Sequence, residues 1–266
     1  MPASIVPGVG RGVLHLFYRV DRIGAQQLPP GAGKELAEIL ADLQSRTQLH
    51  AFSGLGHKAD AMFMAIDPDF TVLREVQSAI ESSAAGTALL LDWSYVSLTE
   101  TSEYTPTEDD ERARLDELDL EQDEYDRRLQ KFTERMAAYN QNKLEPDMPE
   151  WEVACFYPMS HRREGDDNWY SLDYAERRRL MHEHGKSGRA FTGRVLQLVS
   201  GSTGLDDWEW GVTLFAHDIG DLKEIVYDLR YDEASARYGE FGPFIIGLRR
   251  TPHELIAELG LLDGPA

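Results

Sequence analysis

Hydrophobic and polar positions in the first half of the chain follow two periods in turn. Alternation typical of strands is expected at 12–20, 49–55, 61–66 and 88–100. Apolar residues recur with helical spacing from about Gly33, and again after Asp69, whose side chain is a suitable N-cap. The order β-α-β-β-α-β is that of a ferredoxin-like repeat.

The second half shows the same order of elements. Its strands are expected at 151–159, 193–201, 207–217 and 241–250, and its helices at 171–185 and 218–229. Residues 69–76 align with residues 218–225 at a constant offset of 149. Because the order of elements agrees independently of this alignment, the sequence predicts an internal duplication.

A charged segment, residues 107–142, lies between the halves. Its apolar residues keep heptad spacing: Leu115, Leu118, Tyr125, Leu129, Phe132, Met136 and Tyr139. This predicts one long amphipathic helix, stopped by Pro146 and Pro149. The chain is thus divided into repeats at 1–106 and 150–266 and a connecting helix at 107–149, as a two-sheet α+β protein whose interior face would suit a sizeable flat ligand.

Charge and composition exclude several classes of protein. The net charge of −20 argues against nucleic-acid binding, which depends on Lys and Arg. No apolar stretch approaches the ~18 residues of a membrane span, and no secretory signal is visible at the start. One cysteine, Cys155, excludes an internal disulfide and cysteine-rich metal sites. A cytoplasmic protein is expected.

The negative charge is uneven along the chain. Residues 108–126 hold eleven acidic residues against two arginines, which is typical of a solvated outer face. Residues 161–194 instead hold eight Lys and Arg against six acidic residues. This stretch suits a small polycarboxylate ligand. Motifs of dinucleotide sites, P-loops, zincins and α/β-hydrolases are absent.

Two histidines stand out near Gly185, which resembles a helix C-cap. His182 and His184 are two residues apart, about 200° around a helix, so at most one can bind a given metal. A histidine in a last helical turn can simply interact with the helix dipole. A lone neutral imidazole on a helix is also a common proximal ligand of haem iron.

Tyr157 belongs to a strand that runs into the basic turn His161-Arg162-Arg163. It is either an edge-strand residue beside solvated arginines or a redox-active phenol beside cations that bind a carboxylate. Tryptophans at 208 and 210 are typical of a core. The loop at 230–242 resembles both an anion-binding loop and an ordinary exposed turn.

Several blocks in consistent order and spacing carry a family resemblance. They are FYPM-x-x-RR, DNWY, LM-x-EHGKSGR, GRVLQLVSGS-x-GLDDWEWGVTLF and LRYDEASARYGEFGPF, from about Trp151 to Arg249, with SYVSL at 94–98. Together they resemble the chlorite-dismutase-like superfamily, and within it the coproheme decarboxylases. Over residues 1–83 the match is one of architecture only.

The resemblance implies tandem ferredoxin-like repeats that form a dimeric α+β barrel within one chain, usually assembled as a homopentamer. It implies H2O2-dependent oxidative decarboxylation of two propionates of iron-coproporphyrin III (coproheme) to vinyl groups, which gives haem b and CO2 through a tyrosyl radical. The iron porphyrin is then both cofactor and substrate. Coproporphyrin ferrochelatase is the implied transient partner.

The resemblance also assigns roles to individual residues. His184 matches the axial iron ligand, and Tyr157 the tyrosine that forms the radical. Gln197 stands where true chlorite dismutases carry a distal arginine, which argues against chlorite as substrate. Further positions match the porphyrin pocket or its propionate contacts: Met159, Trp169, Trp208, Arg230 and Ser235.

Two propionate-binding positions depart from the family pattern. His161 stands where lysine is common, and Lys143 where arginine is usual. At neutral pH His161 would be only partly charged unless a propionate raises its pKa. Two other functions remain open: haem or coproheme carriage without turnover, which would need His184 but not Tyr157, and a peroxidase or chlorite-degrading activity.

Overall fold

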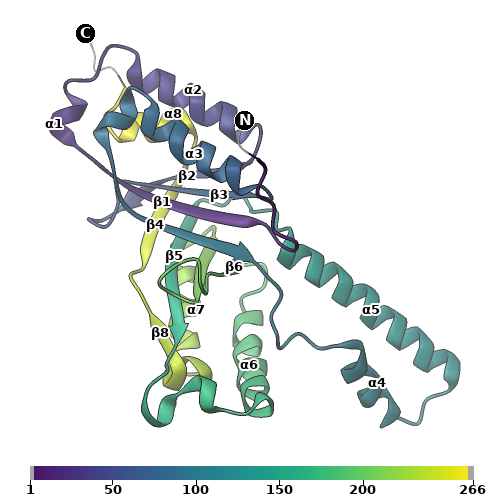
Figure 1. Cartoon of the computed structure of the whole chain (residues 1–266). Helices are drawn as coiled ribbons and strands as arrows, with labels where there is room; N and C mark the ends of the chain where they lie inside the picture. The colour runs from purple at the N-terminus through teal and green to yellow at the C-terminus, as the bar shows by residue number, and fades with distance from the viewer. Residues whose placement is uncertain (1–2, 263–266) are drawn as a thin grey trace.

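A computed structural model describes residues 3–262 of the chain (Figure 1). All six elements predicted for the first repeat are present: β1 (Gly12–Val20), α2 (Ala32–Gln44), β2 (Gln48–Leu55), β3 (Ala61–Asp67), α3 (Phe70–Ser82) and β4 (Leu89–Thr99). A short helix α1 (Arg22–Ala25) and a 3-10 turn at Ala85–Ala88 are added. Asp69 caps α3 as predicted, because its carboxylate accepts a hydrogen bond from the Thr71 N–H at 2.8 Å.

The second repeat also has its six predicted elements: β5 (Val153–His161), α6 (Tyr174–Arg189), β6 (Val195–Gly201), β7 (Trp210–Ala216), α7 (Ile219–Leu229) and β9 (Ile245–Arg250). The pattern did not predict the 3-10 turns Gly165–Asp167 and Trp169–Ser171, the π-helical turn Ala234–Tyr238, β8 (Gly239–Phe241) or α8 (Pro252–Glu258). The predicted helix end at Gly185 is wrong. An ion pair of 2.8 Å between Glu183 and Lys186 spans that position, and α6 continues to Arg189.

The strands form one closed sheet. Within residues 3–262 the strand order is β7-β6-β4-β1-β3-β2-β9-β5-β8, and an additional pairing of β7 with β5 closes a ring that leaves only β8 outside. Each repeat contributes the same internal order, β4-β1-β3-β2 and β9-β5-β7-β6, which confirms the duplication. The two predicted sheets are thus joined at their edges, by β2 with β9 and β4 with β6, and the predicted α+β barrel is confirmed.

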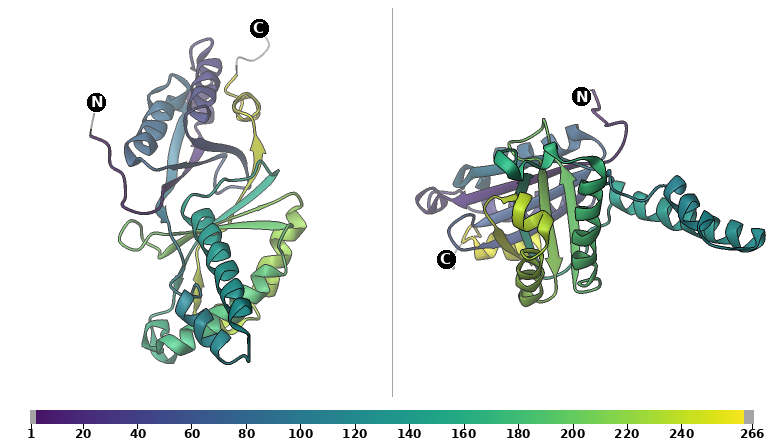
Figure 2. Two further views of the ribbon diagram at one scale, coloured as in Figure 1. Left: turned by 90° about the vertical axis from the view of Figure 1, so that its right-hand side faces the viewer. Right: turned by 90° about the horizontal axis from the view of Figure 1, so that it is seen from below.

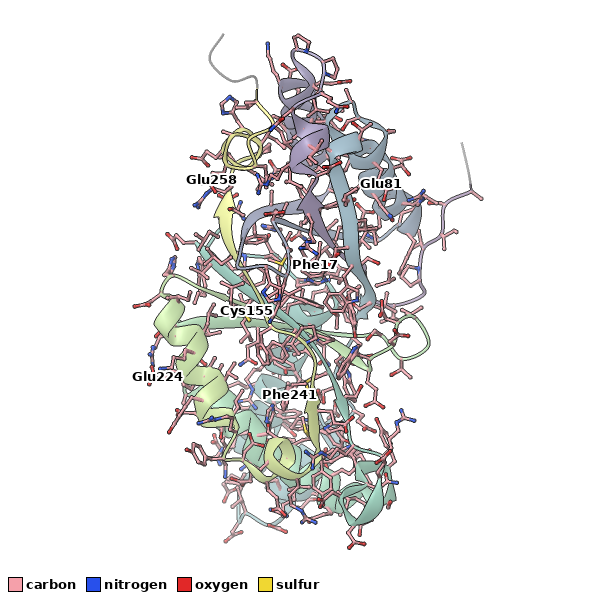
Figure 3. All side chains as sticks on the ribbon, turned by 90° about the vertical axis from the view of Figure 1, so that its left-hand side faces the viewer. Phe17, Glu81, Cys155, Glu224, Phe241 and Glu258 are labelled. Atoms are coloured by element: carbon pink, nitrogen blue, oxygen red, sulfur yellow. The ribbon has the colours of Figure 1, made fainter. Side chains whose placement is uncertain are left out.

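The interior of this barrel is filled by side chains. Along β1, Val13 and Phe17 point inward, and along β5 Ala154 and Phe156 do the same. Figure 3 shows side chains crowding the region around Phe17, where the repeats meet. The expectation that the interior face suits a flat ligand is therefore wrong for the barrel interior, since aromatic rings from both repeats already occupy it.

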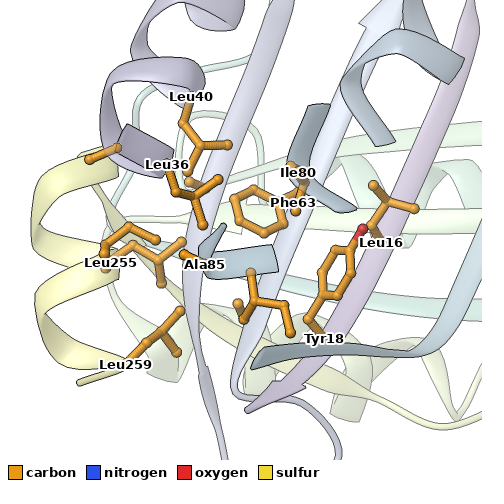
Figure 4. Packing of buried hydrophobic residues seen from close by; sticks show 14 of the residues in the cluster. Leu16, Tyr18, Leu36, Leu40, Phe63, Ile80, Ala85, Leu255 and Leu259 are labelled. Carbon is orange, nitrogen blue, oxygen red and sulfur yellow. The ribbon is translucent and has the colours of Figure 1, made fainter. Parts of the chain in front are cut away.

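The outer faces of the sheet are covered by helices. In the first repeat, α2, α3 and α8 pack on the alternate residues of the strands, including Leu16 and Tyr18 of β1 (Figure 4). Leu255 and Leu259, from the end of the chain, are buried in this same cluster. In the second repeat, α7 packs on β6 and β7, and α6 packs against α7 and the π-helical turn Ala234–Tyr238.

The connector was predicted as one long helix and is instead a helical hairpin. It consists of α4 (Glu108–Asp116) and α5 (Gln122–Leu144), and it projects from the barrel (Figure 2). Reversal of the chain after Asp116 lets Leu115 and Phe132 become buried, which a single exposed helix would not allow. Within the described residues, no helix is both long and apolar enough to cross a membrane.

Candidate functional site

Helix α6 differs sharply from α2, which holds the same place in the first repeat. α2 buries six residues of its 13, whereas α6 buries only Leu180 of its 16. Because a surface helix normally owes its placement to a buried apolar face, α6 leaves its interface with the sheet incompletely packed with apolar side chains. This interface is where a ligand would complete the packing.

His184 lies on α6 and is held by a buried carboxylate. Its Nδ1 is 3.1 Å from Oδ2 of Asp232, whose side chain is 7% exposed. Burial raises the pKa of Asp232, but hydrogen bonds from His184 and Ser235 outweigh this effect, and the pKa lies below its usual value. The carboxylate therefore stays ionised and favours a proton on Nδ1, which leaves Nε2 as the nitrogen able to bind a metal.

Ser235 completes this group. Its backbone N–H donates to Asp232 Oδ1 at 2.9 Å, and its hydroxyl donates to Oδ2 at 3.0 Å. The hydroxyl also lies 3.5 Å from Nδ1 of His184. Sequence reasoning missed Asp232, because it is 48 residues from His184 and no local spacing links them. The only signal was its place in the loop 230–242, which already resembled an anion site.

His161 sits in an aromatic slot. Its ring stacks on Trp169 at 4.1 Å and 8°, and meets the edge of Trp210 at 5.0 Å. Burial lowers the pKa of His161 to about 4, so the ring is neutral at pH 7. Its buried Nδ1 has no hydrogen-bond partner within the described part of the chain. The ring is thus poised to bond a ligand rather than to attract it by charge.

Tyr157 and Met159 alternate with the interior residues of β5 and face outward with His161. Tyr157 is 5% exposed, which rules out an edge-strand residue in solvent. Phe244 packs against its ring at 4.4 Å, and Phe241, labelled in Figure 3, at 6.0 Å. Burial raises the pKa of Tyr157, so the phenol keeps its proton at neutral pH.

Gln197 of β6 approaches α6 directly. A Cβ atom placed on Gly188 would lie 3.3 Å from Nε2 of Gln197. Gly188 is one helical turn after His184 and shares its face of the helix. The outer face of the second repeat therefore meets the His184 face of α6 closely at Gly188, where the absence of a side chain permits the approach of Gln197.

Three predicted site residues have their contacts elsewhere in the part of the chain that the structure describes. Lys143 lies in the last turn of α5, with its ammonium 5.8 Å above the ring centre of Tyr139, and burial lowers its pKa. Arg230 caps α7 and stacks at 4.1 Å on Tyr227. Trp208 packs against the barrel interior, on the opposite face of the sheet from Tyr157.

Comparisons with known proteins agree with this architecture. The family model described as chlorite dismutase matches residues 31–250. A coproheme decarboxylase from Oceanobacillus iheyensis is 40% identical over 78% of this chain and 75% of its own length. A protein from Natronomonas pharaonis named for heme binding is 37% identical over 96% of this chain, which spans 42% of that longer protein.

A solved structure is also similar over nearly the whole chain. The heme-binding protein from Thermus thermophilus has a TM-score of 0.78 and 35% identity, covering 97% of this chain and 98% of its own.

Proposed function

This chain belongs to the chlorite dismutase family, and we propose that it is a coproheme decarboxylase. Its substrate would be iron-coproporphyrin III, and its oxidant H2O2. For each of two propionates, one H2O2 and one proton are consumed, and one vinyl group, one CO2 and two H2O are formed. The observation that carries the proposal is the imidazole of His184, hydrogen-bonded to a buried carboxylate and carried by a sparsely packed helix whose Gly188 lies beside Gln197 of β6.

The donor set fits an iron porphyrin. A histidine whose second ring nitrogen is bonded to a carboxylate is oriented as a metal ligand, and the flexible amide end of Gln197, which lies close to Gly188, would move aside for a flat group between the helix and the sheet. Nε2 of His184 would hold the iron, because Nδ1 is engaged by Asp232. When bound, the iron porphyrin supplies the peroxide-dependent oxidation that no protein side chain provides.

We propose that Tyr157 oxidises the substrate by taking a hydrogen atom from it. Its buried phenol retains the proton on Oη at neutral pH, so it can give up a hydrogen atom and take one back from the propionate β-carbon. The packed rings of Phe241 and Phe244 exclude water from one side of the phenol. Met159 and Trp169 are proposed to line the same pocket.

The residues proposed to bind the propionates include both charged and neutral side chains. We propose a neutral hydrogen bond from His161, a hydroxyl contact from Ser235, and charge contacts from Lys143 and Arg230 if their side chains turn toward the ligand. Trp208 is proposed as a pocket residue on the family resemblance alone, because it packs on the interior face of the sheet, opposite Tyr157. A cytoplasmic homopentamer that exchanges substrate with a ferrochelatase completes the proposal.

The decisive experiment adds ferric coproheme to the purified protein, titrates H2O2, and follows three- and two-propionate products by mass spectrometry. We expect about two equivalents of H2O2 for each haem b, as the balanced reaction requires. Tyr157→Phe should bind coproheme and form neither product, whereas Tyr227→Phe, at an exposed position, should react normally. Bleaching of the bound porphyrin without loss of CO2 would show that the protein is not a decarboxylase.

A haem carrier without turnover is the second candidate, because two of the similar proteins are named for heme binding alone. The same titration separates the two, since a carrier forms no vinyl product in either variant. Chlorite degradation would release oxygen from chlorite at a useful rate. We expect no such release, because Gln197 replaces the distal cation.

A further inference from the structure

Three consecutive arginines tie α6 to three different parts of the molecule. Arg177 Nε donates to Tyr104 Oη at 3.2 Å, and Arg178 forms an ion pair of 2.7 Å with Asp110 of α4. Arg179 forms an ion pair of 3.0 Å with Glu233, next to Asp232. Because the helix buries so little apolar surface, these polar contacts account for much of what holds it against the barrel.

Two of these contacts come from residues close together in sequence: Tyr104, which lies between β4 and α4, and Asp110 in the first turn of α4. Tyr104 stacks on Tyr174 at 5.9 Å and meets the edge of Trp169 at 6.3 Å. The hydroxyl of Tyr174 donates to the carbonyl oxygen of Glu103 at 2.9 Å. Together with the Asp110 ion pair, residues 103–110 hold the first two turns of α6. We call residues 103–110 the clamp.

The clamp reaches α6 from the first repeat. β4 ends at Thr99, α4 begins at Glu108, and the chain between them passes α6 on its way to the hairpin (Figure 1). The residues it holds, 174–178, precede His184 by six to ten positions, about 9–15 Å along the helix axis. A helix transmits such a constraint as a rigid rod, so the clamp limits how far His184 can tilt from the sheet.

We propose that the clamp is the positioning device of the His184 helix and that Tyr104 is its main positioning residue. This inference rests on the proposed function for its consequence at the iron, but not for its effect on the helix. Tyr104 contacts three groups at once: the Arg177 guanidinium, the Tyr174 ring and the Trp169 ring. Trp169 in turn carries the His161 ring, so Tyr104 supports both the axial histidine and a residue proposed to bind propionate.

The test measures amide hydrogen exchange in the ligand-free protein for Tyr104→Leu, Tyr104→Phe and Asp110→Asn. Tyr104→Leu removes every side-chain contact of the clamp residue, and we expect exchange over residues 174–189 to rise about tenfold while the barrel strands keep wild-type protection. Tyr104→Phe keeps the ring contacts and should give a smaller rise. Arg128→Gln, which breaks an ion pair with Glu124 within α5, is the matched control and should leave α6 unchanged.

A second measurement examines the bond between the iron and its histidine ligand. In the ferrous coproheme complex, Tyr104→Leu should broaden and shift the iron–histidine stretching band, and Arg128→Gln should not. If Tyr104→Leu does not fold, the charge reversal Asp110→Arg should loosen α6 and Arg178→Asp in the same chain should restore it. Wild-type exchange over 174–189 in the folded variants, or faster exchange with an unchanged iron–histidine band, would overturn the positioning role.

His184→Ala separates this inference from the proposed function. Loss of the iron–histidine band in that variant supports the axial assignment. If the band persists, the proposed ligand is wrong, while the hydrogen-exchange result still decides whether the clamp holds the helix.

Discussion

Gly188 offers a way to separate the stability of the free protein from ligand binding. It lies within α6, on the face shared with His184, and a Cβ atom there would be 3.3 Å from the side-chain amide of Gln197. We expect Gly188→Leu to stabilise the ligand-free protein and to weaken coproheme binding. The two effects have opposite signs because the same side chain favours the helix and occupies the space between helix and sheet.

The change in stability and the change in affinity can be estimated separately. Replacing a glycine inside a helix by leucine stabilises it by up to about 1 kcal/mol, and the flexible end of Gln197 can move aside in the free protein. With a rigid ligand against Gln197, the added side chain overpacks the interface at a cost of about 1–3 kcal/mol. Since about 1.4 kcal/mol corresponds to tenfold in affinity, the dissociation constant should rise roughly 5- to 150-fold.

The assay is a titration with ferric coproheme followed by Soret absorbance, together with thermal unfolding of the ligand-free protein. Gly185→Leu is the matched control, because a Cβ atom there would meet only the mobile guanidinium of Arg189. It should gain stability and keep wild-type affinity. Wild-type affinity in Gly188→Leu, or an equal loss in both variants, would refute the placement of the ligand between α6 and β6.

Two further predictions concern stability. Phe156→Ala should destabilise the fold by about 3–5 kcal/mol, because its ring, which belongs to the second repeat, packs against aromatic rings of the first repeat. Leu90→Ala, at an exposed position, should change little, and calorimetry compares the two variants. Burial lowers the pKa of His15 to about 3 and of His50 and His161 to about 4. Just below pH 6.5 only the unfolded chain binds protons at these three histidines. The stability that they contribute should therefore be fully present above pH 6.5 and should fall toward pH 4, by up to about 1.4 kcal/mol per pH unit for each histidine. Urea unfolding at several pH values tests this, and His15→Gln should remove about one proton from the dependence; an unchanged slope would contradict it.

Most of the secondary structure could be predicted from the sequence. Alternating and helical periods predicted every strand of the barrel ring and the helices that pair with them, because such periods record which face of an element is buried. The N-cap Asp69 also followed from local chemistry, since its carboxylate bonds the backbone of its own helix, and its counterpart in the repeat alignment, Asp218, caps α7 in the same way. The family and its candidate residues, His184 and Tyr157, were found from motifs in consistent order.

Contacts between distant segments were decided only by the tertiary structure. Closure of the barrel depends on which strand edges meet, and β2–β9 and β4–β6 join residues from opposite repeats. The pairing of His184 with Asp232, the support from Tyr104 and the aromatic filling of the barrel interior have the same origin. A sequence pattern specifies the buried face of each element, but not the partner that covers it. Which partner covers a buried face depends on the side-chain volumes and polar groups that the whole fold brings together. In this protein the first repeat is densely packed as a result, whereas the helix that carries His184 is sparsely packed.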